Sequence, residues 1–263
     1  MTVLEAILLG LIQGLTEFLP VSSSGHLELG KALLGVELPN PLLFSIVVHG
    51  ATALSTLVIF RKTIAQLLSD LLKFKWNWGT QYALWIVVSM IPVGVAGLLW
   101  EDQIELFFDG QILLVGIMLL ITALLLFFTD RSKNPQQEHS WKTVFITGLA
   151  QAVAILPGIS RSGATIATSI LLGVKKEEAA RFSFLMVLPP IVGATLLKVK
   201  ALFSEEMVAT EQLEPHLLII GFLAAFIAGC FACTWMINLV KKSKLSYFAI
   251  YCALAGTLAI IFS

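Results

Sequence analysis

The chain has 263 residues and no net formal charge; 57% of its residues are hydrophobic and only 13% are charged. Its mean hydropathy is +0.90. Soluble domains carry about a quarter charged residues, so this composition excludes a soluble globular domain and predicts an integral membrane protein. The lipid bilayer is therefore an expected partner, and no nucleic-acid partner is expected.

The first apolar stretch, residues 3–34, is interrupted by the polar motif Leu19-Pro20-Val21-Ser22-Ser23-Ser24-Gly25-His26. Each half is shorter than the ~20 residues that a helix needs to cross a bilayer. The first half has no basic leader and contains Gln13 and Glu17, so we expect it to belong to the mature protein and not to a signal peptide. The stretch therefore predicts a re-entrant helix–loop–helix hairpin, which enters the membrane and returns to the same side.

The rest of the chain repeats one plan. Apolar segments of spanning length follow the first hairpin at 42–60, 82–100 and 111–128. A second interrupted stretch, 143–173, contains the motif Leu156-Pro157-Gly158-Ile159-Ser160-Arg161-Ser162-Gly163. Three more spans follow at 182–200, 216–239 and 246–262. We predict one all-α membrane domain (1–263) with six transmembrane helices and two re-entrant hairpins, divided into repeats at 1–130 and 140–263.

The two motifs are related in position. Gln13 and Gln151 lie 138 residues apart, and so do Gly25 and Gly163. Three spans are an odd number, so the second hairpin enters from the opposite side of the membrane. This predicts an inverted-topology repeat, with the functional groups on the interrupted helices.

Basic residues gather on one predicted side of the membrane. The loops 61–81, 129–142, 173–181 and 240–245 hold 13 of the 17 Lys and Arg residues. The loops on the other side are acidic, with Glu101, Asp102, Glu105, Asp109, Glu205, Glu206, Glu211 and Glu214. The positive-inside rule makes the basic side cytoplasmic and places both termini outside. Within the first basic loop, residues 61–75 have the apolar spacing of an amphipathic helix on the membrane surface.

Arg161 is the one basic residue expected at depth in the membrane, where an unpaired charge is costly. Ser160, Ser162 and Thr165 add hydroxyl groups, and the start of the second hairpin helix adds free backbone amides. Because arginine binds phosphate bidentately, this combination predicts a phosphate site. The alternative is a helix break sealed by hydroxyls, with Arg161 reaching toward the cytoplasm.

The first hairpin predicts different chemistry. Gln13 and Glu17 share one helical face, and their oxygens suit a hard divalent cation, Mg²⁺ or Ca²⁺. Ser23 or His26 can act as nucleophile or general base, and we expect Ser22 beside them to bind substrate phosphate. The alternative makes the serines helix caps and the histidine part of a buried hydrogen-bond network.

These motifs resemble a known family. The run from Gln13 to His26 (QGLTEFLPVSSSGH) is similar to the first signature of the bacterial undecaprenyl-diphosphate phosphatases, also called bacitracin-resistance proteins. The run from Pro157 to Thr165 (PGISRSGAT) is similar to their second signature. The resemblance implies removal of the terminal phosphate of the C55 polyprenyl diphosphate, which regenerates the monophosphate carrier for cell-wall synthesis. It also implies a divalent cation, and an active site open to the external face of the bacterial plasma membrane.

The resemblance also assigns residues. It implies that Glu17 and Gln13 form the metal and acid–base pair, that Ser22, Ser23 and His26 form the polar turn, and that Ser160, Arg161 and Thr165 bind phosphate. Many members have glutamate at position 13. Gln13 can coordinate a cation but cannot titrate, so Glu17 must carry more of the proton chemistry.

Several alternatives stay open. Ser23, His26 and an activated water are all candidate nucleophiles, and His49 can line the cavity or simply pack in a span. The same architecture also suits a transporter or flippase of polyprenyl phosphate. A homodimer is compatible with these features, but the sequence does not determine the oligomeric state.

Overall fold

The computed structural model describes residues 1–36, 41–105, 111–132, 136–202, 214–242 and 244–263. These residues form helices and one isolated backbone bridge, between Gln137 and Val174, so the fold is all-α as predicted. In chain order the helices are α1 (Val3–Phe18), α2 (Ser23–Leu34), α3 (Pro41–Ile59), α4 (Arg61–Leu71), α5 (Trp78–Glu105), α6 (Ile112–Thr129), α7 (Trp141–Val153), α8 (Arg161–Leu171), α9 (Lys176–Met186), α10 (Leu188–Leu202), α11 (Pro215–Lys242) and α12 (Ser246–Ile261).

Both interrupted stretches fold as two helices joined by a turn. α1 packs against α2, and α7 packs against α8. A serine caps the N-terminus of each second helix: the hydroxyl of Ser22 accepts from the N–H of Gly25 (3.3 Å), and that of Ser160 accepts from the N–H of Gly163 (3.0 Å). These bonds satisfy backbone amides that a helix start leaves without partners. The two serines are therefore helix caps, whatever else they do.

Several helices have the length and composition of membrane spans. Among the described residues these are Trp78–Leu99 of α5, Ile112–Thr129 (α6) and Pro215–Lys241 of α11. The segments Leu43–Ile59 and Arg61–Leu71, of α3 and α4, qualify as a pair bent by 75°, and α12 is a shorter apolar helix. This is the helix content of a multi-pass membrane protein.

The predicted span 182–200 is divided between two helices. α9 ends before Val187, and α10 begins at Leu188. Pro189 and Pro190 follow at once, in the first turn of α10, where the missing N–H of a proline costs no helical hydrogen bond. The residues on both sides of this break are apolar, so hydropathy alone did not reveal it.

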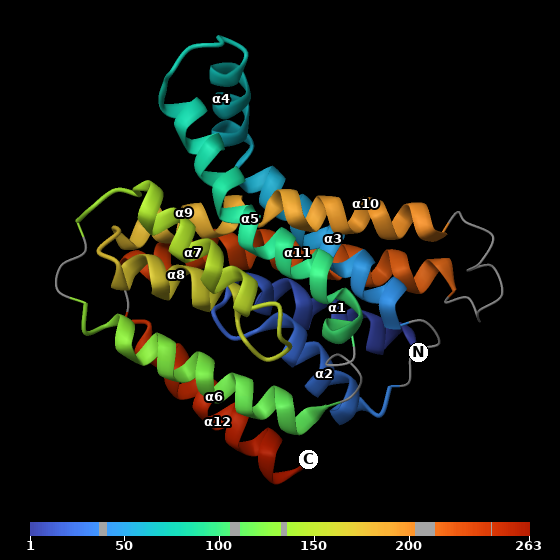
Figure 1. The fold of residues 1–263 in the computed structure, drawn as a ribbon. Coiled ribbons are helices and arrows are strands. Elements are labelled where there is room, and N and C mark those ends of the chain that lie inside the picture. Colours follow the sequence, from blue (N-terminus) through green and yellow to red (C-terminus); the bar gives the residue numbers. More distant parts are fainter. Residues whose placement is uncertain (37–40, 106–110, 133–135, 203–213, 243) are drawn as a thin grey trace.

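The helices form one bundle with a separate pair at its edge. α3, α5, α10 and α11 cross the molecule in roughly one direction, while α6 and α12 pack on each other along the lower edge (Figure 1). Buried side chains of α5, α6, α8 and α9 contribute to the largest apolar core, among them Tyr82, Leu119, Ile166 and Phe182. Both termini lie on the side of the molecule away from the α6–α7 and α8–α9 connections (Figure 1).

Glycine allows two pairs of helices to approach closely. A Cβ atom on Gly14 of α1 would lie 2.5 Å from the carbonyl oxygen of Ala225 in α11. A Cβ atom on Gly148 of α7 would lie 2.5 Å from the carbonyl oxygen of Ser89 in α5. Both contacts bring backbone against backbone, as small residues do between helices in membranes.

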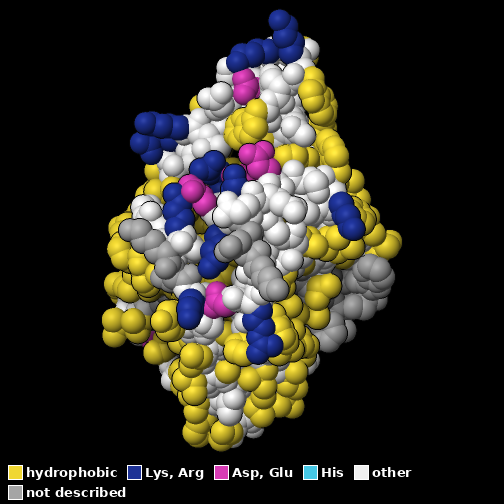
Figure 2. Space-filling view, turned by 90° about the vertical axis from the view of Figure 1, so that its left-hand side faces the viewer, with side chains coloured by type: hydrophobic (Ala, Val, Ile, Leu, Met, Phe, Trp, Pro, Cys, Tyr) yellow, Lys and Arg dark blue, Asp and Glu magenta, His cyan; other side chains and the backbone are white. Residues whose placement is uncertain are grey.

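The loops predicted to be basic meet on one face. Figure 2 shows this face, on which Lys and Arg side chains gather. Some of them pair with acidic residues of α9, as Lys241 does with Glu177 (2.6 Å). Of the charged residues used to predict the topology, Lys133, Asp109, Glu205, Glu206 and Glu211 lie outside the described residues.

Candidate active site

The carboxylate of Glu17 is the centre of a hydrogen-bond network near the end of α1, and its side chain is only 5% exposed. Gln13, one turn earlier on the same face, donates from Nε2 to Oε2 (2.8 Å). Ser23, the first residue of α2, donates its hydroxyl to the same oxygen (2.6 Å). Arg161 donates from Nη2 to the other oxygen, Oε1. Both hairpins therefore contribute groups that compensate this buried charge.

The hydroxyl groups predicted to bind phosphate have protein partners in this conformation. The Ser160 hydroxyl caps α8, and that of Ser162 donates to the carbonyl oxygen of Leu19 (3.0 Å). The hydroxyl oxygens of Thr165 and Ser183 lie 2.6 Å apart. The second hairpin is thus tied both to the first hairpin and to α9.

The turns of the two hairpins touch. A Cβ atom on Gly25 would lie 3.2 Å from the Cα of Gly158, and a Cβ atom on Gly163 would lie 3.3 Å from the Cβ of Pro20. Gly158 has φ +93°, in the left-handed region, and any side chain there would also meet the carbonyl oxygen of Val115 at 2.6 Å. The structure therefore brings together the two motifs that the sequence singled out.

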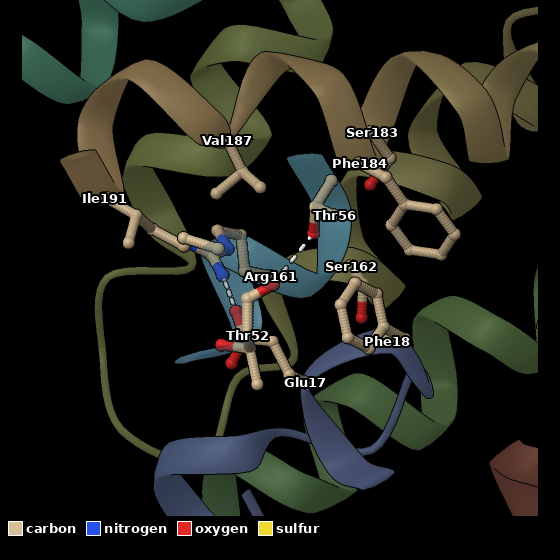
Figure 3. A pocket seen from close by; sticks show the side chains of 11 residues that line it. Glu17, Phe18, Thr52, Thr56, Arg161, Ser162, Ser183, Phe184, Val187 and Ile191 are labelled. Carbon is tan, nitrogen blue, oxygen red and sulfur yellow. Dashed lines mark hydrogen bonds and ion pairs between the residues drawn. The ribbon is translucent and has the colours of Figure 1, made fainter. Parts of the chain in front are cut away.

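A small cavity adjoins the Glu17–Arg161 pair. Thr52 and Thr56 of α3, together with Ser162 and apolar side chains of α9 and α10, line its wall (Figure 3). Its volume is about 10 Å³, close to the minimum that holds one water molecule. A diphosphate needs far more room, so the structure shows a closed site.

His26 does not line this cavity. Its Nδ1 lies 2.8 Å from the carbonyl oxygen of Ser22, which can only accept, so Nδ1 carries a proton. Its Nε2 lies 2.7 Å from the hydroxyl of Tyr251 in α12 and accepts from it when the ring is neutral. Ser22 has φ 72°, a conformation that residues with a side chain seldom adopt. Both ring nitrogens of His26 are therefore engaged with residues outside this cavity.

His49 lies at the site instead. Its Nε2 is 3.8 Å from Oε2 of Glu17, and its Nδ1 donates to the carbonyl oxygen of Ser45 (2.8 Å). In the sequence this residue is a lone histidine in an apolar segment, which packing explains equally well. Thr52 and Thr56 carried no signal either, because single threonines are ordinary in membrane helices. Thr52 and Thr56 lie one turn apart on α3, and only the structure shows that both line the same cavity as Glu17.

The oxygens near Glu17 resemble a cation site that substrate phosphates would complete. No cluster of three or more His, Cys, Asp or Glu side chains suited to a metal occurs among the described residues. Oε1 of Gln13 is buried without a hydrogen-bond partner, so one oxygen is available beside the carboxylate. Mg²⁺ commonly binds one or two carboxylates and completes its shell with water and substrate phosphates. The residues present fit that kind of site.

Comparison with known proteins agrees with the sequence motifs. The profile of the family described as "Bacitracin resistance protein BacA" matches residues 6–258. The undecaprenyl-diphosphatase of Christiangramia forsetii is 59% identical over 100% of this chain and 99% of its own length. The one from Bacteroides fragilis is 54% identical over 98% and 97%, respectively. The one from Oceanobacillus iheyensis is 39% identical over 99% and 97%.

Proposed function

The chain belongs to the bacitracin resistance protein BacA family, and we propose from this membership and from the contact between Glu17 and Arg161 how it acts. It is a membrane-bound undecaprenyl-diphosphatase, which hydrolyses the terminal phosphate of undecaprenyl diphosphate and regenerates the monophosphate carrier. The activity serves cell-wall synthesis and confers resistance to bacitracin. The observation that carries the mechanism is the ion pair joining the two hairpins at a closed cavity.

Arg161 binds the terminal phosphate. In this structure its guanidinium group pairs with the Glu17 carboxylate. When the substrate enters, phosphate oxygens replace the carboxylate oxygen as the partner of the guanidinium group. α8 begins at Arg161, so the positive end of its helix dipole lies at this residue. Ser162 and Thr165 exchange protein partners for phosphate oxygens. Arg161 stabilises the charge of the transition state as the P–O bond breaks.

Ser23 is the nucleophile that the geometry supports best. Its hydroxyl already donates to Oε2 of Glu17 (2.6 Å), the arrangement of a nucleophile beside its general base. The Ser23 oxygen attacks the terminal phosphorus and its proton passes to Glu17. As the bond from phosphorus to the bridging oxygen breaks, Glu17 gives this proton to that oxygen, so that undecaprenyl phosphate leaves and Glu17 is again a carboxylate. Water then hydrolyses the phosphoserine with Glu17 as base, which releases inorganic phosphate and restores Ser23. His26, held by Ser22 and Tyr251, is a second candidate for proton transfer.

Gln13 and Glu17 are the residues that would hold a Mg²⁺ or Ca²⁺ ion together with the substrate. A bound cation supplies Lewis-acid neutralisation of the diphosphate oxygens. Gln13 also orients the Glu17 carboxylate through its Nε2 donor (2.8 Å). The amide thus has a positioning role that does not depend on a metal.

An inverted repeat with six spans and two re-entrant hairpins is the topology that we propose for the membrane. Three observations support it. Gly10 and Gly148 lie 138 residues apart, and each meets a neighbouring helix at its backbone, α11 for Gly10 and α5 for Gly148. The basic loops share one face, and both termini lie away from it (Figure 1). With the basic face cytoplasmic, both termini are external, and the site opens to the external side of the plasma membrane.

Phosphate release from purified protein tests the enzymatic function. Wild type in detergent, with a polyprenyl diphosphate and Mg²⁺ or Ca²⁺, releases inorganic phosphate. Arg161→Lys keeps the positive charge but cannot bind phosphate through two parallel hydrogen bonds, and its kcat falls by about 10²–10³-fold. The matched control Arg131→Lys changes an arginine that stacks on Phe127 and retains activity. Wild type without phosphate release, or Arg161→Lys equal to wild type, would refute the proposal.

Rapid quenching identifies the nucleophile. With substrate labelled in its terminal phosphate, Ser23 becomes labelled in wild type and Ser23→Ala stays unlabelled and inactive. Ser69→Ala, at an exposed serine of α4, behaves as wild type. Label on His26 would make that histidine the nucleophile. Phosphate that carries an oxygen atom from water, formed without any phosphoprotein, would assign the attack to water. Lipid movement across vesicles without phosphate release would instead favour the flippase alternative.

A further inference from the structure

α4 leaves the bundle and stands apart from it. It is bent by 75° from α3 at Phe60 and projects beyond the other helices (Figure 1). If α3 crosses the membrane, a helix at this angle lies close to the plane of the bilayer. The turn after α4 then returns the chain to α5, which begins at Trp78.

The connection to α5 is firm. Asp70 accepts from Nζ of Lys73 (2.6 Å), and its backbone carbonyl accepts from the side chain of Asn77 (3.0 Å). A Cβ atom on Gly79 would lie 2.4 Å from the Cβ of Asp70, so α4 and the start of α5 touch. Leu67 is buried in the main core. Residues 61–78, which we call the α4 anchor, are thus held in one orientation.

That orientation exposes large apolar side chains. Leu68 is 57% exposed, Leu72 74%, Phe74 92% and Trp76 69%. Leu68 lies in the last turn of α4, and Leu72 caps the end of that helix one turn later. Phe74 and Trp76 extend the same apolar surface beyond it. Water would be a poor solvent for so much contiguous apolar area, which indicates that another phase or molecule covers it.

The charge of the anchor is almost entirely positive. Its basic residues are Arg61, Lys62, Lys73 and Lys75, and all four are exposed. Asp70 is its one acidic residue, and it is buried and paired with Lys73. The anchor also belongs to the basic face of Figure 2. A partner that covers this surface must therefore be both apolar and anionic.

We propose that the α4 anchor binds the surface of the leaflet on the basic side of the molecule and selects anionic lipid headgroups. Leu68, Leu72, Phe74 and Trp76 enter the boundary between headgroups and acyl chains, and the lysines contact lipid phosphates. A second copy of this chain fits less well. A two-fold contact would set the basic residues of one anchor against those of the other.

Hydrogen exchange of the full-length protein in nanodiscs tests this. Amides of the α4 anchor exchange more slowly in discs that contain phosphatidylglycerol than in discs of phosphatidylcholine alone. The double variant Lys62→Gln, Lys75→Gln lowers the ratio of exchange rates between the two kinds of disc, by ~5-fold for each lysine at low salt. Both lysines are exposed and remote from Glu17, so phosphatase activity in detergent stays at the wild-type level. Arg131→Gln, a basic residue of another loop, keeps the protection.

A second measurement covers the apolar part. Brominated phosphatidylglycerol quenches the fluorescence of Trp76 in wild type; the contribution of Trp76 is obtained as the difference between wild type and Trp76→Phe. The double variant Leu72→Ser, Phe74→Ser lowers this quenching. Equal exchange in the two kinds of disc, or quenching unchanged by the serine variant, would overturn the proposal. Protection that depends on having two protein molecules per disc would assign the surface to a second copy.

Discussion

At the scale of single residues, Gln13 shows how one amide serves a buried charge. Its Nε2 donates to Glu17, while its Oε1 is buried without a partner. A glutamate at this position would remove the donor and set a second carboxylate beside the first. Glutamine therefore stabilises this closed site without a cation, which an ionised glutamate could not do.

Gln13→Glu should make stability depend on divalent cations. In EDTA the free energy of unfolding of the variant is about 1–3 kcal/mol lower than that of wild type, because a hydrogen-bond donor to a buried carboxylate is replaced by a like charge. Mg²⁺ or Ca²⁺ restores most of the loss, and thermal unfolding in detergent measures both effects. Gln111→Glu, at the N-cap of α6, is the control and gains no such dependence. An equal melting temperature with and without cation would contradict this account.

The sequence predicted the site where its residues form a pattern. Glu17, Ser23 and Arg161 stand in two long motifs that interrupt apolar helices, and the structure joins them in one network. For His49 the sequence left two interpretations open, lining the cavity or packing in a span, and Tyr251 was missed, because each is a single polar residue on an apolar helix. Only three-dimensional contact distinguishes them from residues that merely pack.

At the scale of helices, close backbone contact limits what the chain tolerates. A Cβ on Gly14 would lie 2.5 Å from the Ala225 carbonyl oxygen and 2.7 Å from the Cβ of Ala228. Neither neighbour is the flexible end of a long side chain, so α1 and α11 would have to separate. α1 carries Glu17, and its position against α11 therefore sets the position of the site.

Gly14→Ala should destabilise the protein by about 1–3 kcal/mol through overpacking. Gly94→Ala is the matched control, because a Cβ there meets nothing within 4 Å. Alanine is the better helix former, so the control is neutral or more stable by about 0.5–1 kcal/mol. Melting temperatures in one detergent compare the two variants. Equal losses would show that the contact between α1 and α11 is looser than the structure indicates.

The helices themselves were easier to predict than their ends. Hydropathy located the interrupted stretches and α6, because charged or polar residues bound them. It did not locate the break between α9 and α10, where Leu188 and the prolines after it continue an apolar run. The bend between α3 and α4, in contrast, falls at Phe60, where the predicted span 42–60 ends and the predicted amphipathic helix 61–75 begins, because Arg61 and Lys62 end the apolar run.

At the scale of the whole molecule, His139 joins distant parts of the chain. It precedes α7, is 5% exposed, and packs against Phe182 of α9 at 4.3 Å between ring centroids and against Trp85 of α5 at 6.0 Å. Burial lowers its pKa from 6.5 to about 4. The folded protein therefore keeps this ring neutral at pH values where the unfolded chain takes up a proton.

Stability should fall as the pH drops from about 6.5 to about 4. Above 6.5 the ring is neutral in both states, and this contribution is fully present. Between the two pKa values only the unfolded state binds the proton, and the loss reaches roughly 3 kcal/mol near pH 4. His139→Gln removes this part of the pH dependence, whereas His216→Gln, at an exposed histidine, does not. Identical melting curves for wild type and His139→Gln across this range would be the contrary result.

The closed cavity has a consequence for the cell that owns the membrane. A polar site between two hairpins of a membrane protein is a place where protons and ions could leak across the bilayer. Here the Glu17–Arg161 pair and about 10 Å³ of space leave room for about one water molecule, too little for a continuous file. Until the Glu17–Arg161 pair separates, this cavity therefore offers no continuous file of water past the buried charges.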